Sequence, residues 1–391
     1  MNVLQELPQH QLTEFLYRKA SRARIPLSGT FELSPVCNFA CRMCYVRKTP
    51  QEVRDHYRRI LKLEDWLRIA REGKEQGLLY LLLTGGEPLL WPDFWTLYEE
   101  LVAMGMLISI NTNGSLIDEA AIARFRKHPP RRINITLYGA SDETYKRLCG
   151  ADCVFSKVDR AIRGLKEAGS PVKINCSRTP DNACDQEKII QYAAELDLKL
   201  DMTCYMFPPV RRDPQMVGVN ERFTPQETAE YRARTFLLQN GRKAYERYLA
   251  DIRKGSIDPP GLEEGCVDPV DGKIRCRAGK STFWITWDGW ITPCGMMPDP
   301  RVDVTAGNIA QVWRQLTQVA EQTMLSGVCD KCPNQNVCHP CAAMAAAETG
   351  TTTGIPRYLC EMTQRMREIA QSDSGGNSCH QAIDIDSPSS L

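Results

Sequence analysis

The sequence lacks three features that would place it in a familiar class of protein. It has no excess of charge, because 49 basic and 48 acidic side chains leave a formal net charge of +1, whereas nucleic-acid-binding chains usually carry a basic excess or a basic face. It has no apolar run close to the about 20 residues of a membrane-spanning helix, and the run Leu78–Leu83 falls far short. Residues 1–15 lack the basic and then apolar layout of a signal peptide. These absences predict a cytoplasmic protein that binds neither nucleic acid nor a membrane.

Cysteine is the residue type that stands out against this background. The chain has 17 cysteines, an odd number, and no export signal that would favour disulfides. They fall into groups: three lie between residues 37 and 44, and eight lie between residues 266 and 360. In a reducing compartment grouped thiolates more often bind metal. We therefore expect metal or cluster ligation.

Short β-rich runs alternate with amphipathic helical stretches from residue 30 to about residue 210. There are six such alternations, and each helix is long enough to connect parallel strands. The pattern predicts an α/β fold with a parallel sheet covered by helices, either an open sheet or a barrel. Cys37, the sequence GGEP (85–88) and the sequence TNG (112–114) follow the first three strands. Candidate site residues thus gather at the C-terminal ends of strands, where active sites of such folds lie.

The chain divides into five segments by composition. We expect a helical lead-in over residues 1–29, the α/β unit over 30–210, a helical linker over 211–262 and a cysteine-rich unit over 263–365. Residues 366–391, rich in Ser, Gly and Asp, are expected to be a disordered tail.

Cys37, Cys41 and Cys44 have the spacing Cys-x3-Cys-x2-Cys. Pairing them in disulfides would leave one thiol over, and a zinc site would need a fourth ligand such as His56. A four-iron cluster held by three thiolates instead leaves one iron open to a cofactor or substrate. The spacing resembles the signature of the radical S-adenosylmethionine (SAM) superfamily, in which an aromatic residue such as Tyr45 commonly follows the last cysteine.

Two further segments carry the same resemblance. TGGEPLL (84–90) matches the second motif of the family, which implies that Gly85 and Gly86 let the backbone approach the methionine end of SAM and that Glu87 accepts from its ammonium group. On its own a Gly-Gly pair after a strand would be an ordinary turn. NTNG (111–114) resembles the third-strand motif, which implies that Asn113 lines the cofactor pocket.

The segment NITLYGASDETYKRLCG (134–150) resembles the part of the family that carries a polar strand residue and then an arginine. In this chain these residues are Thr136 and Arg147, and the resemblance implies contacts with the ribose and the methionine carboxylate of SAM. A guanidinium fork suits a carboxylate. The family more often has serine at the first position, and an arginine on a helix is also commonly just solvated.

The downstream cysteines resemble the SPASM extension of radical SAM enzymes. Cys276, Gly289 and Cys294 give Cys-x12-Gly-x4-Cys, and CDKCPNQNVCHPC (329–341) and Cys360 follow. One spacing departs from the family pattern, because two residues rather than three precede the last cysteine of the 329–341 run. A zinc knuckle is the rival interpretation of that run.

The SPASM resemblance implies two auxiliary [4Fe-4S] clusters in addition to the SAM-binding one, three in all. The implied ligands of the first auxiliary cluster are Cys276, Cys294 and Cys341. Cys266 either completes this set or leaves one iron open. The implied ligands of the second are Cys329, Cys332, Cys338 and Cys360.

Together the resemblances imply a partial (β/α)6 barrel of TIM type followed by a small cysteine-rich SPASM domain. They also imply that one electron from the first cluster cleaves SAM, and that the resulting 5′-deoxyadenosyl radical takes a hydrogen atom from a substrate. SPASM enzymes mostly modify peptides or proteins by thioether or carbon–carbon cross-links or by epimerisation. We therefore expect a peptide or protein substrate and a flavodoxin- or ferredoxin-like reductant. Because only 36 residues precede Cys37, we expect either a separate leader-binding protein or recognition of the substrate in the cavity itself.

Three alternatives stay open at this point. The substrate is a small molecule or cofactor precursor, the chain matures sulfatases, or it is an iron–sulfur electron carrier without catalysis. Sulfatase-maturing relatives place an aspartate base after the cysteine aligned with Cys294, where this chain has Gly295. Cys204, at the end of the sixth strand, is a tentative hydrogen-atom donor of the kind that an epimerase needs.

Overall fold

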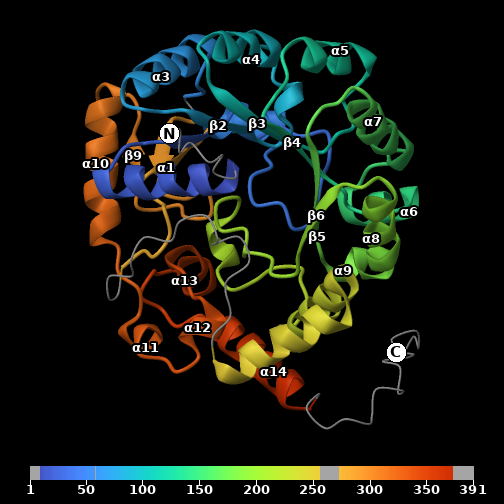
Figure 1. Cartoon of the computed structure of the whole chain (residues 1–391). Coiled ribbons are helices and arrows are strands. Elements are labelled where there is room, and N and C mark those ends of the chain that lie inside the picture. Colours follow the sequence, from blue (N-terminus) through green and yellow to red (C-terminus); the bar gives the residue numbers. More distant parts are fainter. Residues whose placement is uncertain (1–8, 58, 256–272, 373–391) are drawn as a thin grey trace, which may run out of the picture.

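The computed structural model describes residues 9–57, 59–255 and 273–372 (Figure 1). Their strands form one sheet in the order β6-β5-β4-β3-β2-β1-β7-β8-β9. The first six strands pair in parallel. They are β1 (Ser28–Glu32), β2 (Tyr80–Thr84), β3 (Leu107–Thr112), β4 (Arg132–Thr136), β5 (Val172–Ser177) and β6 (Lys199–Thr203). This confirms the predicted α/β fold with a parallel sheet.

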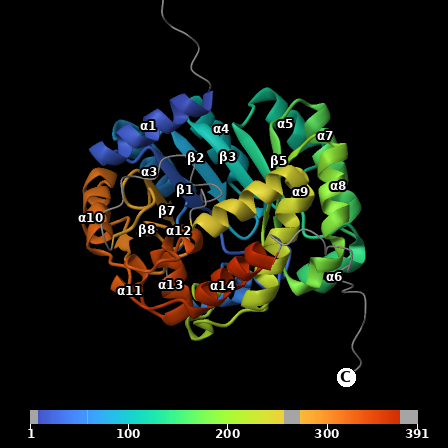
Figure 2. The same ribbon diagram turned by 60° about the horizontal axis from the view of Figure 1, so that its bottom comes forward.

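Helices cover the outer face of the curved sheet (Figures 1 and 2). They are α3 (Leu63–Glu75), α4 (Phe94–Ala103), α5 (Glu119–Lys127), α7 (Phe155–Glu167) and α8 (Gln186–Glu195). The spacing of apolar residues explains how they pack. In α7, Val158, Ile162 and Leu165 recur at helical spacing and are fully buried.

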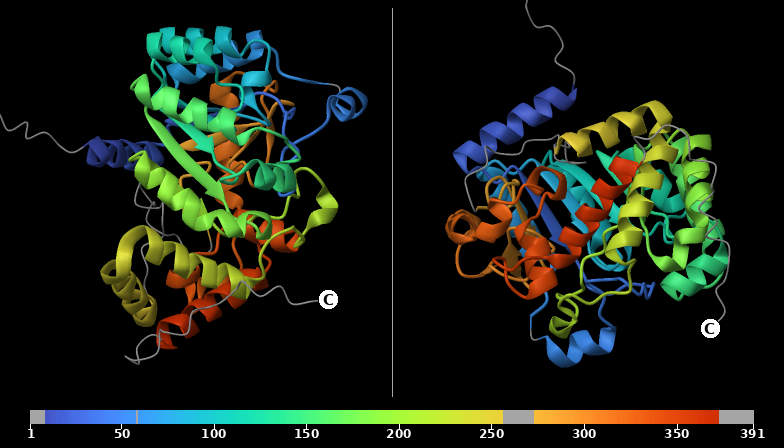
Figure 3. Two further views of the ribbon diagram at one scale, coloured as in Figure 1. Left: turned by 90° about the vertical axis from the view of Figure 1, so that its right-hand side faces the viewer. Right: turned by 90° about the horizontal axis from the view of Figure 1, so that it is seen from below.

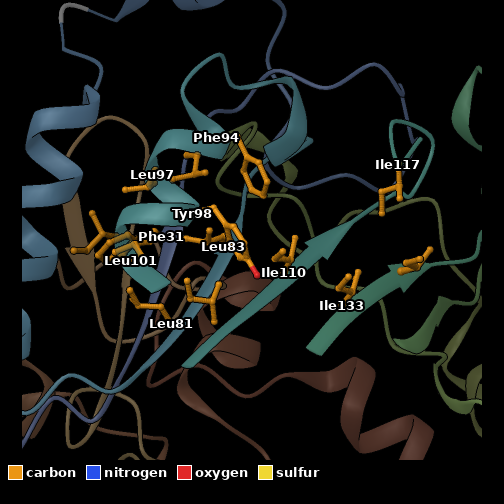
Figure 4. Close-up of a cluster of buried hydrophobic side chains, with 14 of the residues drawn as sticks. Phe31, Leu81, Leu83, Phe94, Leu97, Tyr98, Leu101, Ile110, Ile117 and Ile133 are labelled. Atoms are coloured by element: carbon orange, nitrogen blue, oxygen red, sulfur yellow. The ribbon is translucent and has the colours of Figure 1, made fainter. Parts of the chain in front are cut away.

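The core lies between these helices and the sheet. Figure 4 shows side chains of α4 turned toward Leu81, Leu83 and Ile110 of the neighbouring strands. The alternate strand residues, such as Asn111 and Asn134, are only half-buried, because successive side chains of a strand point to opposite faces. The face of the sheet away from the helices therefore carries polar side chains.

The cysteine-rich segment continues the same sheet. Strand β7 (Thr282–Ile285) pairs in parallel with β1, and β8 (Trp290–Thr292) and β9 (Val302–Asp303) extend the sheet in antiparallel fashion. Helix α10 (Ile309–Gln322) packs on this edge. The two units predicted from composition thus share one sheet.

The remaining helices surround the C-terminal part of the chain and its loops. Helix α9 (Pro225–Lys254) bends at Gly241, whose φ is 77°, and packs against α14 (Arg357–Ser372) (Figure 2). The shorter ones are α6 (Asp142–Cys149), η1 (Pro88–Leu90), η2 (Pro180–Asp185), η3 (Pro214–Met216), α11 (Gly327–Asp330), α12 (Gln335–Cys338) and α13 (Ala342–Thr349).

Helices near the N-terminus lie on two sides of the molecule. Helix α1 (Gln9–Ala23) lies opposite α2 (Pro50–His56), which stands away from the body of the chain (Figure 3). None of the helices in the described ranges has the length and apolar character that a bilayer crossing requires.

The predicted tail boundary needs a correction. Helix α14 runs to Ser372, so the chain is still helical beyond residue 365. Met366 and Ala370 are buried against α9, and this packing holds the last turns. Residues 373–391 lie outside the described residues, as do most of the predicted linker residues after 255.

Candidate active site

Cys37, Cys41 and Cys44 lie together on the loop that follows β1. The Phe39 N–H donates to Cys37 Sγ at 3.3 Å, and the Arg47 N–H donates to Cys44 Sγ at 3.3 Å. Burial raises the pKa of Cys37 to about 12. A free thiol there stays protonated at neutral pH, and a bound metal is what would hold it as the thiolate.

The chemistry of the donors suits an iron–sulfur cluster. All fifteen cysteines within the described ranges are free thiols, so Cys37, Cys41 and Cys44 are available as ligands. Thiolates are the usual ligands of [4Fe-4S] clusters. The donor set therefore fits the cluster that the sequence implies.

The GGEP loop lies directly against the segment that leads to Cys37. The Gly86 N–H donates to the Ser34 carbonyl at 2.7 Å, and the Glu87 N–H donates to the Val36 carbonyl at 3.0 Å. A Cβ on Gly86 would lie 2.4 Å from the Val36 oxygen. The glycine thus has a role that the sequence did not indicate, because it allows two backbones of the site to touch.

Glu87 joins the loops after β2 and β3. Its carboxylate is fully buried and accepts from Thr112 Oγ1 at 2.8 Å, the Asn113 N–H at 2.8 Å and the Leu89 N–H at 3.1 Å. All three donors are groups of the protein itself, so the carboxylate already has hydrogen-bond partners without a cofactor. The contact with the SAM ammonium group stays a prediction, and the structure gives Glu87 a positioning role.

The burial of Glu87 also predicts that the stability of the folded protein depends on pH. Burial raises its pKa from 4.5 to about 7, so folding favours the neutral carboxyl. The stabilisation that the neutral Glu87 carboxyl gives to the folded state is complete below pH 4.5 and is lost as the pH rises through 7. The free energy of unfolding should fall by up to about 3 kcal/mol over this window. Chemical unfolding at pH 5 and pH 8 measures it, and Glu87→Gln should lose that difference. An unchanged pH dependence in the variant would show that another group is responsible.

Asn113 ties the third-strand loop to the cysteine loop. Its Nδ2 donates to Asn38 Oδ1 at 2.9 Å and lies 3.8 Å from Cys37 Sγ. Its Oδ1 accepts from the N–H and the hydroxyl of Ser115. The structure thus brings the loops after β1, β2 and β3 together.

Thr136 and Arg147, the two predicted SAM contacts that match the family pattern least well, lie in different surroundings. Thr136 ends β4 and is half-buried beside Asn175 of β5. The guanidinium of Arg147 donates to the Asp181 carbonyl of η2 at 2.6 and 2.9 Å and approaches Cys184 Sγ at 3.5 Å. Arg147 therefore already has backbone partners, and its contact with the SAM carboxylate stays a prediction.

Cys204 packs toward helix α9. It is 6% exposed. Burial raises the pKa of its thiol, while Arg178 and a hydrogen bond with Thr235 of α9 act against that rise. The thiol is thus buried next to α9. Its role as a hydrogen-atom donor stays a prediction.

Two further buried residues, Arg178 and Cys149, were not identified as site residues from the sequence. Arg178 is fully buried after β5, 4.8 Å from the Tyr231 ring centroid, and its Nε and Nη1 have no hydrogen-bond partner. Cys149 is buried at the end of α6, and its hydrogen bond lowers the pKa of the Cys41 thiol. The sequence gives no signal for this contact, because a lone cysteine usually behaves as a small buried hydrophobic residue.

The downstream cysteines gather in the two groups that the SPASM resemblance implies. Cys276, Cys294 and Cys341 pack around one small apolar cluster that includes Phe207 and Met296. The thiols of the second group act on one another electrostatically, and the thiol of Cys329 is buried. The members of this group are Cys329, Cys332, Cys338 and Cys360. Cys266 lies outside the described residues. Ligation by both groups stays a prediction.

Gly295 shows why no acidic residue follows Cys294. A Cβ on Gly295 would lie 2.5 Å from ring atoms of Trp284, so an aspartate would collide with the indole. The position that carries the base of sulfatase-maturing relatives is thus closed in this chain.

Three cysteines on the loop after the first of six parallel strands, with glycine- and asparagine-containing loops after the next two, define a SAM-cleaving iron–sulfur enzyme. Residues 31–193 match the sequence profile of the radical SAM superfamily. A probable GTP 3′,8-cyclase of Sulfurisphaera tokodaii is 32% identical over 278 residues, which cover 70% of this chain and 82% of that protein. The chain belongs to the radical SAM superfamily.

Two further proteins are similar over more of the chain. An AdoMet-dependent heme synthase of Methanosarcina barkeri is 25% identical and matches 82% of this chain and 92% of its own length. The crystal structure of Streptococcus suis SuiB bound to the precursor peptide SuiA superimposes with a TM-score of 0.63 at 17% identity, covering 90% of this chain and 80% of SuiB. Over the residues that the structure describes, the fold therefore resembles that of SuiB.

Proposed function

We propose that this radical SAM enzyme abstracts a hydrogen atom from a peptide or protein and leaves a thioether or carbon–carbon cross-link or an epimerised residue. The observation that carries the proposal is the shared sheet. Strand β7 lies beside β1, which leads to Cys37, and the loop after β8 carries Cys294. In support of the proposal, 90% of this chain superimposes on SuiB, whose structure holds a bound precursor peptide.

The proposed site has three [4Fe-4S] clusters. Cys37, Cys41 and Cys44 hold the first, and the two downstream groups hold the auxiliary clusters. Cys266 either completes the Cys294 group or leaves one iron of that cluster open. When bound, SAM and the reduced first cluster supply the 5′-deoxyadenosyl radical. Tyr45 and the loops of Gly86 and Asn113 shape the pocket beside it. A flavodoxin- or ferredoxin-like protein supplies the electron, and a separate protein presents the leader of the substrate.

The polar face of the sheet supports a peptide substrate. Asn134 Nδ2 donates to Asn111 Oδ1 at 2.8 Å, and both side chains are half-buried, as are Thr136 and Asn175. Amide and hydroxyl groups offer donors and acceptors for peptide backbone groups. The residues of this chain would thus bind and orient the substrate and exclude water from the radical.

A small molecule or cofactor precursor is the second candidate. It is favoured by the names of the sequence relatives, a GTP 3′,8-cyclase and a heme synthase, the latter matched over 92% of its length. Sulfatase maturation is disfavoured, because the Trp284 ring fills the space beyond Gly295.

Isotope transfer tests the proposal. The reconstituted protein, reduced without oxygen, should convert SAM to 5′-deoxyadenosine. With a deuterated peptide encoded beside its gene, the 5′-deoxyadenosine should gain one deuterium by mass spectrometry, and the peptide should lose hydrogen or exchange it. Transfer from deuterated GTP or a deuterated porphyrin in place of the peptide would support the second candidate. Absence of 5′-deoxyadenosine under all conditions would remove the catalytic interpretation.

A further inference from the structure

A buried ion pair lies between the two units. Glu32, the last residue of β1, is fully buried, and the Arg211 side chain, on the loop between β6 and α9, is 12% exposed. Arg211 Nη2 donates to Glu32 Oε1 at 2.7 Å and Nη1 donates to Oε2 at 3.0 Å. Trp284 Nε1 donates to Oε2 at 2.9 Å. Such a two-pronged pair fixes the guanidinium in position.

The same guanidinium reaches both cysteine loops. Arg211 Nη1 donates to the Gly295 carbonyl at 2.8 Å, and Gly295 follows Cys294 in the chain. Its central carbon lies 5.6 Å from the centroid of the Tyr45 ring, and Tyr45 follows Cys44. One charged side chain thus connects the loop of the SAM-binding group with the loop of the first auxiliary group.

The positive charge of Arg211 lies beside the residue that follows Cys294, because its Nη1 donates to the Gly295 carbonyl. A guanidinium stays protonated in proteins, and the pair with Glu32 holds it in place. A fixed cation favours an added electron on a neighbouring cluster, because charge and hydrogen bonding set cluster potentials.

We propose that Arg211 is a positioning residue that raises the reduction potential of the auxiliary cluster held by Cys294, and that Glu32 acts against it. The inference rests on the ligand role proposed for Cys294. Arg211 contacts the loop of that ligand directly, because it donates to the Gly295 carbonyl. Glu32 holds the cation in place and partly cancels its field.

Potentiometric titration followed by electron paramagnetic resonance tests this inference. It is done in a Cys37→Ala background, so that only auxiliary clusters contribute. Arg211→Gln should shift the potential of one auxiliary cluster to a more negative value, and Glu32→Gln should shift it to a more positive value. In Arg211→Lys, which keeps the positive charge, the potential of this cluster should stay close to that of the parent protein. A structural role alone predicts shifts of the same sign in both glutamine variants, because both break one ion pair.

Arg222→Gln is the matched control. Arg222 lies on the same loop and forms a buried pair with Glu348 at 2.7 Å, with 6% and 5% of the two side chains exposed. Arg222 stacks on Tyr358, near Cys360 of the other cysteine group. This variant should therefore lose comparable stability without shifting the potential of the cluster held by Cys294. If both auxiliary clusters form but the glutamine variants shift together or not at all, the inference fails while the cluster assignment stands. If iron analysis shows no cluster at Cys294, the assignment fails and the inference falls with it.

Discussion

Cys37→Ala should abolish 5′-deoxyadenosine formation. Cys37, Cys41 and Cys44 lie on one loop and have N–H donors directed at two of their sulfurs, and two thiolates do not retain a cluster that needs three protein ligands. Iron should fall by about a third, from about twelve to about eight atoms per chain, because each cluster has four. Activity is measured by chromatography of the nucleoside and iron by colorimetric assay.

Cys153→Ala is the control for this variant. Cys153 is an exposed cysteine of the same half of the chain and belongs to neither cysteine group. It should keep full iron and full activity. Residual nucleoside formation in Cys37→Ala at a tenth of the parent rate or more would show that the three cysteines are not the SAM-binding ligands. An iron content of about four in the parent protein would refute the two auxiliary clusters.

The parallel half of the fold follows from local pattern. Residues such as Leu81 and Leu83 in β2, and Val158 and Ile162 in α7, are buried on the faces that their strand and helix spacings predict. The order of short strands and crossover helices then leaves little choice of topology. The loop positions of Cys37, Gly86 and Asn113 at one end of the sheet follow directly from this.

The join between the two units could not be predicted. Strand β7 has four residues, Thr282–Ile285, too few for a reliable periodic signal, and its partner β1 lies some 250 residues earlier in the chain. Glu32 and Arg211 form a pair across 179 residues of sequence. Contacts of this kind depend on how the loops pack. A division of the chain by composition does not predict them, because it treats the two units as separate.

Side-chain direction at strand ends was the other missing information. Cys204 follows β6 and is predicted as a hydrogen-atom donor because it lies near the C-terminal end of the sheet. The structure gives its thiol a hydrogen bond with Thr235 of α9, a contact that the sequence pattern does not provide, and the donor role stays a prediction. Arg147 similarly has the predicted position on a helix but uses its guanidinium on the Asp181 carbonyl.

Gly86→Ala should have the largest effect among substitutions outside the cysteines. The added Cβ would lie 2.4 Å from the Val36 oxygen and 2.8 Å from the Pro35 oxygen. Both are backbone atoms, so no side-chain rotation relieves the contact. Separating the loops would also break the Gly86–Ser34 hydrogen bond of 2.7 Å. The cost should be about 3 to 5 kcal/mol from overpacking and lost hydrogen bonds.

The consequence of Gly86→Ala should be local, because the clash moves the segment that leads to Cys37. Iron should fall by about a third with loss of 5′-deoxyadenosine formation, while the auxiliary clusters keep their spectroscopic signals. Gly327→Ala, where a Cβ meets nothing within 4 Å, should keep all iron and activity. A Gly86→Ala protein with full iron but no SAM binding by calorimetry would mean that the glycine serves the cofactor alone. Full activity would mean that the two loops separate without cost, which the backbone contacts argue against.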